Sequence, residues 1–263
     1  MITMKKNNLE TFLAKIRSGN IAIGVCISLT DLSVTEAAAD AGYDFCWIDM
    51  EHGNLDRNEV MQHIVTLTGS GCAPIVRVSW NEHGLIKSVI DLAPAGILVP
   101  MVNTAEEAAK VVSACRYPPL GTRSCGFRRA TGYGAFPVEP YMELSEHDPL
   151  VIVQIEHKSA VRNLDEILAV PGVDSICIGP YDLSASCGKP GEFNAPEVAD
   201  MYDEICEKTL KAGKILGAYG CSDFALWKKR SVQWLSITND IYALADAYKM
   251  LLNQANTILN KME

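Results

Sequence analysis

Two carboxylates follow neighbouring apolar runs of this sequence, at positions where side chains often do chemistry. Glu156 follows the run Val151–Ile155, and Asp182 follows the run Ser175–Ile178. A segment with apolar residues at helical spacing separates the runs, which predicts a strand–helix–strand unit. Because the carboxyl ends of parallel strands meet at one edge of a sheet, both acids should lie at that edge. They suit a small divalent cation such as Mg²⁺ or Mn²⁺; capping a helix or forming an ion pair is the alternative role.

Further polar side chains follow other predicted strands. Asp49 and His52 follow the second apolar run, Arg77 lies inside the third, and Gln154 lies at the end of the fifth. An arginine inside an apolar run is costly to bury unless an anion faces it. Arg77 could therefore stabilise negative charge on a substrate, or it could form a structural ion pair with Asp49 or Glu51. A histidine side chain can exchange protons at neutral pH, so His52 is the available base, and Asp49 could fix its tautomer.

These residue types fit metal-assisted carbonyl chemistry. A cation held by two carboxylates keeps roughly four of six octahedral positions open, so a 2-oxo acid can chelate it through its carboxylate and ketone oxygens. Loss of a proton, or of a carbon–carbon bond, at the adjacent carbon then gives a metal-stabilised enolate. A Schiff base would need a buried strand lysine, but Lys214 lies at a strand start and Lys158 beyond a strand end. No Gly-rich turn follows the last two strands, which disfavours a phosphosugar.

Eight short apolar runs alternate with helical segments along the 263 residues. Near-continuous apolar strands are typical of parallel sheets that are covered on both faces. No Rossmann-type G-x-G-x-x-G motif follows the first run, so the pattern favours an α/β fold of the closed (β/α)8 TIM-barrel type over an open doubly wound sheet. We expect one domain over residues 1–263. The expected strands are Ile21–Ile27, Phe45–Ile48, Pro74–Val78, Gly96–Val99, Val151–Ile155, Ser175–Ile178, Ile215–Tyr219 and Gln233–Ile237.

Two segments interrupt this alternation. Tyr117–Asp148 has little periodic apolar pattern, and a connection of this length predicts a lid or binding loop, over the barrel mouth or against a neighbouring subunit. Asp240–Glu263 predicts a closing helix with a wide apolar stripe. Such a stripe must be buried against the barrel or another subunit, so we expect a homo-oligomer.

The composition excludes several classes of partner. The net charge is −9 and the pI is about 5.1, which argues against a surface that binds nucleic acids or anionic membranes, because such a surface needs clustered Lys and Arg. The only basic cluster is Arg123, Arg128 and Arg129. No apolar run has the length of a membrane span, and the N-terminus has no signal-peptide pattern. The nine cysteines lack paired short spacings and predict buried thiols in a reducing compartment, the cytoplasm.

Several motifs occur together along nearly the whole chain. They are DMEHG (Asp49–Gly53), the arginine of PIVRV, GILVPMVNTAEEA (Gly96–Ala108), YPPLGTRSCGFRRA (Tyr117–Ala130), VQIE and IGPYDLSAS. In combination they resemble the HpcH/HpaI aldolase family, which includes 4-hydroxy-2-oxoheptanedioate aldolase and 2-dehydro-3-deoxyglucarate aldolase. The resemblance implies a (β/α)8 barrel, a divalent metal cofactor (Mg²⁺, Mn²⁺ or Co²⁺), and reversible retro-aldol cleavage of a 4-hydroxy-2-oxo acid to pyruvate and an aldehyde. It also implies a homohexamer, a trimer of dimers that exchange their last helix.

The resemblance also assigns roles to single positions. Glu156 and Asp182 look like the metal ligands, His52 like the base, and Arg77 like the enolate-stabilising arginine. Asp91, in SVIDLAPAG, looks like the carboxylate that raises the basicity of the histidine, within one chain or across a subunit boundary. The expected substrate-binding residues are Gln154, Gly179, Pro180, Tyr181 (through its backbone), Asp182 and Arg77.

The chain departs from the family pattern at a few positions. Ala93 and Pro94 replace a usual Gly-Ala pair after Asp91, and His157 replaces a usual threonine. Tyr181 stands where some members have alanine, and it could narrow the pocket around the pyruvyl methyl group or reach the acceptor aldehyde. Three alternatives stay open. Decarboxylation of oxaloacetate would use the same enolate. Binding of a small carboxylate without turnover is disfavoured because it has no need of a base, and cleavage of coenzyme A thioesters is disfavoured because no basic nucleotide-binding patch is evident outside Arg123–Arg129.

Overall fold

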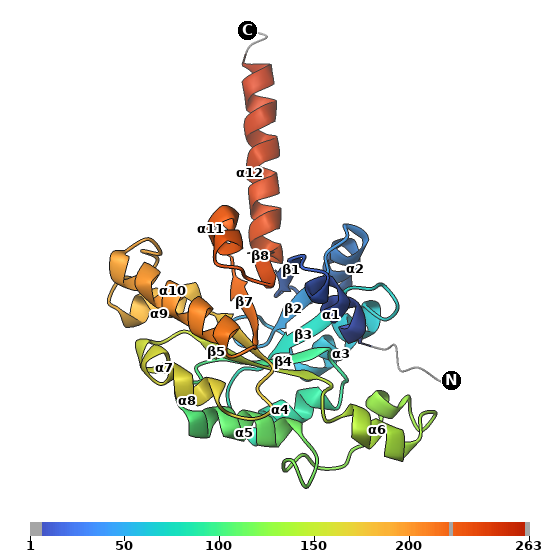
Figure 1. Cartoon of the computed structure of the whole chain (residues 1–263). Coiled ribbons are helices and arrows are strands. Elements are labelled where there is room, and N and C mark those ends of the chain that lie inside the picture. Colours follow the sequence, from blue (N-terminus) through green and yellow to red (C-terminus); the bar gives the residue numbers. More distant parts are fainter. Residues whose placement is uncertain (1–6, 221–222, 261–263) are drawn as a thin grey trace.

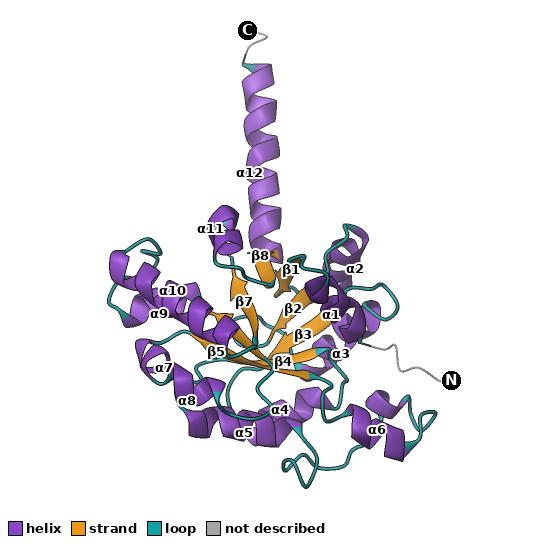
Figure 2. Ribbon diagram, viewed as in Figure 1, coloured by secondary structure: helices purple, strands orange, loops and turns teal. Residues whose placement is uncertain are grey.

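Eight buried strands pair in sequence order and close into a parallel barrel in the computed structural model, which describes residues 7–220 and 223–260 (Figures 1 and 2). The last strand, β8, pairs with β1 to close the barrel. The (β/α)8 fold is therefore confirmed, and each expected strand lies within two residues of its observed ends. The strands are β1 (Ala22–Ile27), β2 (Phe45–Asp49), β3 (Ala73–Arg77), β4 (Gly96–Val99), β5 (Leu150–Ile155), β6 (Ser175–Ile178), β7 (Ile215–Tyr219) and β8 (Trp234–Asn239).

Helices surround the barrel, and several begin at capping signals in the sequence. The carboxylate of Asp56 accepts hydrogen bonds from the backbone N–H groups of Asn58 and Glu59, and that of Glu59 accepts from the N–H of Asp56. This capping box satisfies backbone donors that the first turn of α3 leaves unpaired. The helices are α1 (Leu9–Arg17), α2 (Leu32–Asp40), α3 (Arg57–Thr66), α4 (His83–Ile90), α5 (Ala105–Cys115), η1 (Arg129–Thr131), α6 (Val138–Leu144), α7 (Lys158–Arg162), α8 (Leu164–Leu168), α9 (Pro180–Ser186), α10 (Pro196–Lys211), α11 (Phe224–Lys229) and α12 (Asp240–Leu259).

The interior of the barrel is filled by aromatic rings at the end where the strands begin. Helix α1 closes this end, and its Phe12 meets Phe45 edge-on with ring centroids 5.7 Å apart. Phe45 in turn packs edge-on against Trp234 at 5.4 Å. Gly217, on the neighbouring strand, makes room for the indole, because a β-carbon there would overlap the ring of Trp234. The remaining apolar side chains form a second layer between the strands and the surrounding helices.

The segment Tyr117–Asp148 does not cover the mouth of its own barrel, so this part of the expectation is wrong. It connects α5 to β5 and therefore lies at the end where the strands begin. Arg129 donates a hydrogen bond of 2.8 Å to the carbonyl of Leu92, just before β4, and Asp148 accepts from Asn7 at 2.8 Å. A connection from a helix to the next strand lies opposite the active-site end of such a barrel. That the segment Tyr117–Asp148 packs against a neighbouring subunit remains a prediction.

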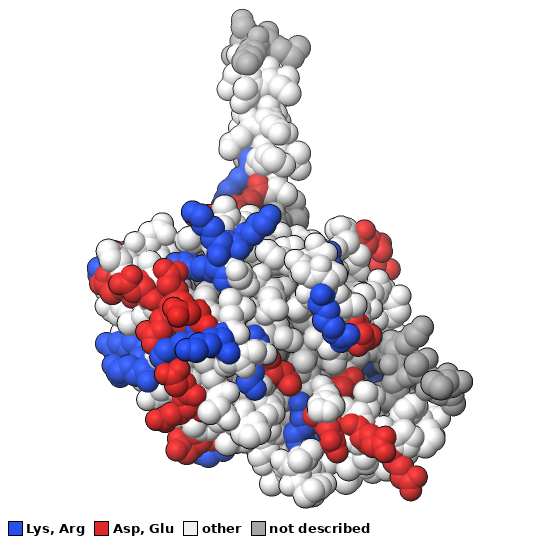
Figure 3. Space-filling view, viewed as in Figure 1, with Lys and Arg blue, Asp and Glu red and all other residues white. Residues whose placement is uncertain are grey.

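Helix α12 projects from the barrel instead of packing on it (Figure 1). Its first residue, Asp240, is buried, whereas Leu251, Leu252, Ile258 and Leu259 are each more than half exposed. In Figure 3 the outer part of the helix is almost free of charged side chains, while Lys or Arg and Asp or Glu are interspersed over the barrel. The expected apolar stripe is therefore present, and the barrel residues that the structure describes leave its outer part uncovered.

Two smaller expectations can be compared with the described part of the chain. No disulfide joins the described cysteines, and six of them, Cys26, Cys46, Cys72, Cys115, Cys177 and Cys206, are buried. Within residues 7–220 and 223–260, no helix has both the length and the apolar character that crossing a bilayer requires. Of the other three cysteines, Cys125 is exposed, Cys187 is half-buried, and Cys221 lies outside the described residues.

Replacing Gly217 by alanine should destabilise the barrel by about 2 kcal/mol or more, because the added methyl group would displace the buried ring of Trp234. The measurement is the free energy of unfolding from urea denaturation. Gly84→Ala is the matched control, since a β-carbon at this helical position meets nothing within 4 Å. Equal stabilities of the two variants would contradict the tight packing described here.

Candidate active site

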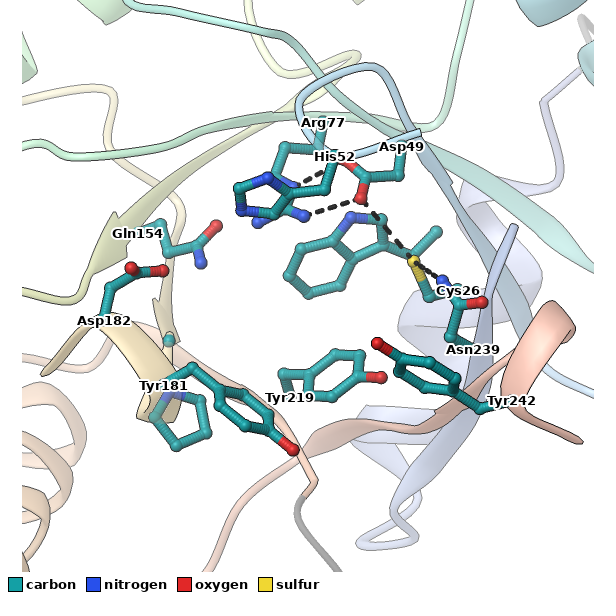
Figure 4. A pocket seen from close by; sticks show the side chains of 13 residues that line it. Cys26, Asp49, His52, Arg77, Gln154, Tyr181, Asp182, Tyr219, Asn239 and Tyr242 are labelled. Carbon is teal, nitrogen blue, oxygen red and sulfur yellow. Dashed lines mark hydrogen bonds and ion pairs between the residues drawn. The ribbon is translucent and has the colours of Figure 1, made fainter. Parts of the chain in front are cut away.

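A cavity of about 410 Å³ opens at the end of the barrel where the strands finish (Figure 4). This is the end at which barrel enzymes place their catalytic residues. The structure brings eight of the expected site residues to this cavity, and three further residues described below, Glu156, Asp91 and Glu51, do not line it. The eight lining residues are Asp49, His52, Arg77, Gln154, Gly179, Pro180, Tyr181 and Asp182.

The centre of the site is an ion pair between two neighbouring strands. The strand register sets Asp49 of β2 directly beside Arg77 of β3. Nε and Nη2 of Arg77 donate to the two carboxylate oxygens of Asp49 at 2.8 and 2.6 Å, and both residues are buried. Nη1 of Arg77 lies 2.8 Å from the Glu51 carboxylate, and the guanidinium stacks over Trp47. The structural ion pair that the sequence left open is therefore present. Arg77 pairs with both Asp49 and Glu51, and its side chain also lines the cavity.

The surroundings of this pair keep the arginine charged. Burial alone would favour the neutral form, but the hydrogen bonds and negative charge of Asp49 outweigh it and raise the pKa of Arg77. Burial raises the pKa of Glu51, while the positive charge of Arg77 opposes this increase. A fixed cation that faces the cavity can stabilise negative charge as it develops on a bound molecule.

Glu156 occupies a confined position behind the cavity surface. One oxygen accepts from the backbone N–H of Met101 at 2.7 Å, and the other accepts from Nε2 of Gln154 at 2.5 Å. Met101 has a positive φ of 55°, an uncommon conformation for a residue other than glycine. Burial, together with the negative charges of Glu51 and Asp182, raises the pKa of Glu156 to about 8. This carboxyl group therefore lacks a nearby positive charge that would fully offset the cost of its ionisation.

A divalent cation fits this arrangement of oxygen atoms. The charges of Glu156 and Asp182 act on each other, and Oε1 of Gln154 is buried without a hydrogen-bond partner among the described residues. Gly179 packs directly against Glu156 and Gln154, because a β-carbon there would overlap both side chains. Across residues 7–220 and 223–260, no three His, Cys, Asp or Glu side chains gather into a metal-binding group. A cation would therefore have two carboxylate ligands and would complete its shell with substrate and water oxygens.

His52 lies at the cavity and is exposed to solvent. Asp49 binds Arg77, the backbone N–H of Glu51 and the thiol of Cys26, and the hydrogen bonds of the described residues include none between Asp49 and His52. The two residues thus share the cavity, while the role of Asp49 in fixing the histidine tautomer remains a prediction.

Asp91 is not brought to this cavity within one chain. It caps the C-terminus of α4 and so lies at the opposite end of the barrel. Its carboxylate accepts a long hydrogen bond of 3.4 Å from the buried guanidinium of Arg123, and Gly126 approaches it closely. Only a second copy of the chain could place Asp91 near His52.

The cavity has five further lining residues that sequence reasoning did not select: Cys26, Trp47, Tyr219, Asn239 and Tyr242. Tyr219 and Asn239 are the last residues of β7 and β8. The strand-end rule that selected Gln154 would have found both of them. Tyr242 appeared in the sequence only as part of a helical segment, so no signal marked it as a lining residue.

Comparisons with known proteins agree with this geometry. The sequence profile of the family described as HpcH/HpaI aldolase/citrate lyase matches residues 23–252. The chain is 34% identical to a hydroxypyruvate/pyruvate aldolase of Roseobacter denitrificans, over 96% of this chain and 97% of the relative. It is 38% identical to a 2-keto-3-deoxy-L-rhamnonate aldolase of Escherichia coli, over 78% and 77% of the two chains.

A solved structure extends the agreement to three dimensions. The crystal structure of an HpcH/HpaI aldolase from Desulfitobacterium hafniense superposes with a TM-score of 0.86 at 26% identity, covering 92% of this chain and 95% of that one. The similarity therefore includes the barrel and nearly the whole length of both chains. Profile, sequence identity and fold lead to the same conclusion: the chain belongs to the HpcH/HpaI aldolase/citrate lyase family.

Proposed function

We propose that this protein is a divalent-metal-dependent class II aldolase that cleaves a 4-hydroxy-2-oxo acid reversibly to pyruvate and an aldehyde. The observation that carries the proposal is the cavity that the Asp49–Arg77 pair and Asp182 line, with the buried Glu156 carboxylate directly behind its surface. Family membership supports the same carbon–carbon lyase chemistry. The names of the aligned relatives also describe aldolases that act on 2-oxo acids.

Glu156 and Asp182 would hold the cation, which we propose to be Mg²⁺, Mn²⁺ or Co²⁺. A bound cation would polarise the ketone of the 2-oxo acid and so increase the acidity of its methyl protons. The side-chain amide nitrogen of Gln154 donates a hydrogen bond to Glu156 and so orients that carboxylate, while the side-chain carbonyl oxygen of Gln154 is buried. The backbone turn at Gly179–Pro180 and Tyr181 borders the position of the 2-oxo acid.

The remaining steps belong to side chains of the cavity. Arg77 places its positive charge where the ketone oxygen gains negative charge during cleavage, and Asp49 and Glu51 hold its planar guanidinium in position. His52 would move the proton between the substrate hydroxyl and solvent, for which its exposed position at the cavity is suitable. Asp91 would act on this histidine from a second subunit.

The apolar face of α12 supports a homo-oligomer. Burying an exposed apolar stripe stabilises an assembly by roughly 25 cal/mol for each Å² removed from water. Because α12 projects from the barrel, a second copy can cover it without a change in the barrel itself. We propose a hexamer built as a trimer of dimers that exchange α12.

The enolising step should appear as metal-dependent exchange of the pyruvate methyl protons in deuterated water, followed by NMR. Asp182→Asn should lower the exchange rate at least about 100-fold, because the amide replaces a charged ligand. Removing divalent ions with a chelator should have the same effect, reversed by adding Mg²⁺, Mn²⁺ or Co²⁺. Asp165→Asn is the control, since this acid pairs with Lys208 on the outer surface. Absence of exchange with all three metals would overturn the proposed function.

Arg77→Ala should slow pyruvate proton exchange by about 100-fold to 1,000-fold, because the developing charge loses its fixed cation. Binding of Mn²⁺, measured by electron paramagnetic resonance, should persist, since Arg77 is not a proposed ligand. Arg77→Lys should recover only part of the rate, because an ammonium group cannot pair with Asp49 and Glu51 as the planar fork does. Full turnover in the alanine variant would refute the assigned role.

Leu252→Glu should weaken the assembly, because it places a charge on the exposed apolar face of α12. Sedimentation velocity at several protein concentrations measures the change. Lys249→Gln is the control on the same helix, where the wild-type side chain is polar and 72% exposed. If both variants keep the mass of the wild-type assembly, this face does not form the interface.

A further inference from the structure

The turn that follows β4 holds one of the proposed metal ligands through its backbone. The N–H group of Met101 donates to Oε1 of Glu156 at 2.7 Å. Met101 has a φ of 55°, in the left-handed region, where the β-carbon of a residue other than glycine is crowded by the following carbonyl oxygen. A residue adopts this conformation only where its surroundings hold it there. The contacts of Met101 therefore decide whether its N–H group reaches Glu156.

Asn103 provides a contact that holds Met101. Its side-chain Nδ2 donates to the carbonyl oxygen of Met101 at 2.8 Å, so the side chain bridges the turn back to the residue with the uncommon conformation. The carbonyl oxygen of Met101 can only accept hydrogen bonds, which fixes the orientation of the Asn103 amide. The Oδ1 atom of Asn103 then faces the hydroxyl group of Ser159 and accepts from it at 3.0 Å.

Two backbone contacts fix Asn103 itself. Its N–H group donates to the carboxylate of Glu107, in the first turn of α5, at 2.6 Å. Its carbonyl oxygen accepts from the side-chain amide of Asn163 at 2.9 Å. Ser159 and Asn163 lie within and directly after α7, the helix that follows Glu156. Asn103 thus ties the turn after β4 to the part of the chain that comes directly after Glu156.

The direction of the Glu156 carboxylate depends on its hydrogen-bond partners. One of its oxygens accepts from Met101, and the other accepts from the side-chain amide of Gln154. Such partners orient metal-binding side chains, and the loss of one typically lowers metal affinity about tenfold to 100-fold. A side chain whose direction is already fixed also loses less conformational entropy when a ligand binds. A residue that positions the Met101 N–H group therefore contributes to metal affinity without touching the metal.

Building on the proposed function, we infer that Asn103 is a positioning residue for the metal site. It holds Met101 in the left-handed conformation and directs the N–H group of this residue at Glu156. The direction in which the carboxylate faces the cation is fixed as a result. Asn103 does not line the cavity, so it acts through Met101 and not by contact with the 2-oxo acid.

The first experiment measures the affinity of the metal-free protein for Mn²⁺ by electron paramagnetic resonance. Asn103→Ala should raise the Kd about tenfold, because Met101 leaves its conformation and Glu156 loses an orienting partner. Ser159→Ala removes one anchor of the Asn103 side chain and should raise the Kd about threefold. Asn20→Ala is the matched control, since Asn20 is exposed and lies between α1 and β1, where the strands begin. An unchanged Kd in Asn103→Ala overturns the inference; should that variant not fold, an unchanged Kd in Ser159→Ala does so.

The second experiment tests whether Asn103 acts through the conformation of Met101. Glycine adopts the left-handed region without steric cost, so in a Met101→Gly protein the turn needs no contact to hold it there. Adding Asn103→Ala to that protein should raise the Kd about threefold or less, against about tenfold when methionine is present. A residue that merely stabilises the fold would give the same factor in both proteins. Equal factors would therefore refute the positioning role.

Hydrogen exchange of the metal-free protein, followed by mass spectrometry of peptides that span Met101, gives a readout that requires no cation. The Met101 amide should exchange about tenfold faster in Asn103→Ala than in wild type, because its N–H group no longer stays on Glu156. Peptides from β8, which lies across the barrel from β4, should be unchanged and serve as the internal control. Equal exchange of the Met101 amide in both proteins would contradict the inference.

Mn²⁺ binding separates this inference from the proposed function. If wild-type protein binds Mn²⁺ and Asp182→Asn abolishes this binding, while Asn103→Ala leaves it unchanged, the inference fails and the proposed metal site stands. If wild-type protein neither binds Mn²⁺ nor exchanges the pyruvate protons, the proposed function fails, and the inference fails with it.

Discussion

The site depends on one ion pair set by strand register, in which Asp49 on β2 lies beside Arg77 on β3. A guanidinium among apolar strands would be costly without a bidentate partner, and Asp49 provides that partner at 2.6 and 2.8 Å. Glu51 binds the remaining nitrogen, so the plane of the guanidinium is fixed before any ligand enters. A shift of the β2–β3 register by one residue would separate the pair and turn the arginine away from the cavity.

The fold could be predicted because local and long-range signals agree. Apolar runs of four to seven residues alternate with helical segments, and a parallel barrel is the arrangement that buries every run on both faces. The same logic placed Gln154, Asp182 and Arg77 at one end of the barrel, because residues at strand ends inherit their position from the strands. For these residues, order along the chain was enough to indicate position in space.

Sequence order indicates less where position depends on loop paths or on other copies of the chain. Asp91 caps α4 at the far end of its own barrel, so its expected role beside His52 depends on a second copy of the chain and remains a prediction. Tyr117–Asp148 reads as a possible lid, although its place between a helix and the following strand sends it to that same end. The position of Tyr242 at the cavity had no signal in the sequence, since periodicity cannot show that the helix leaves the barrel after its first turn.

The aromatic packing beneath the cavity affects the order of binding and release. Because α1 and the rings of Phe12, Phe45 and Trp234 close one end of the barrel, both ligands must enter and leave through the other. Under the proposed function, pyruvate would lie beside the buried Gln154, and the aldehyde would lie nearer the opening, where Tyr181 and Tyr242 are exposed. Cleavage should therefore follow an ordered uni–bi kinetic scheme, in which the aldehyde departs first and pyruvate is the competitive product inhibitor.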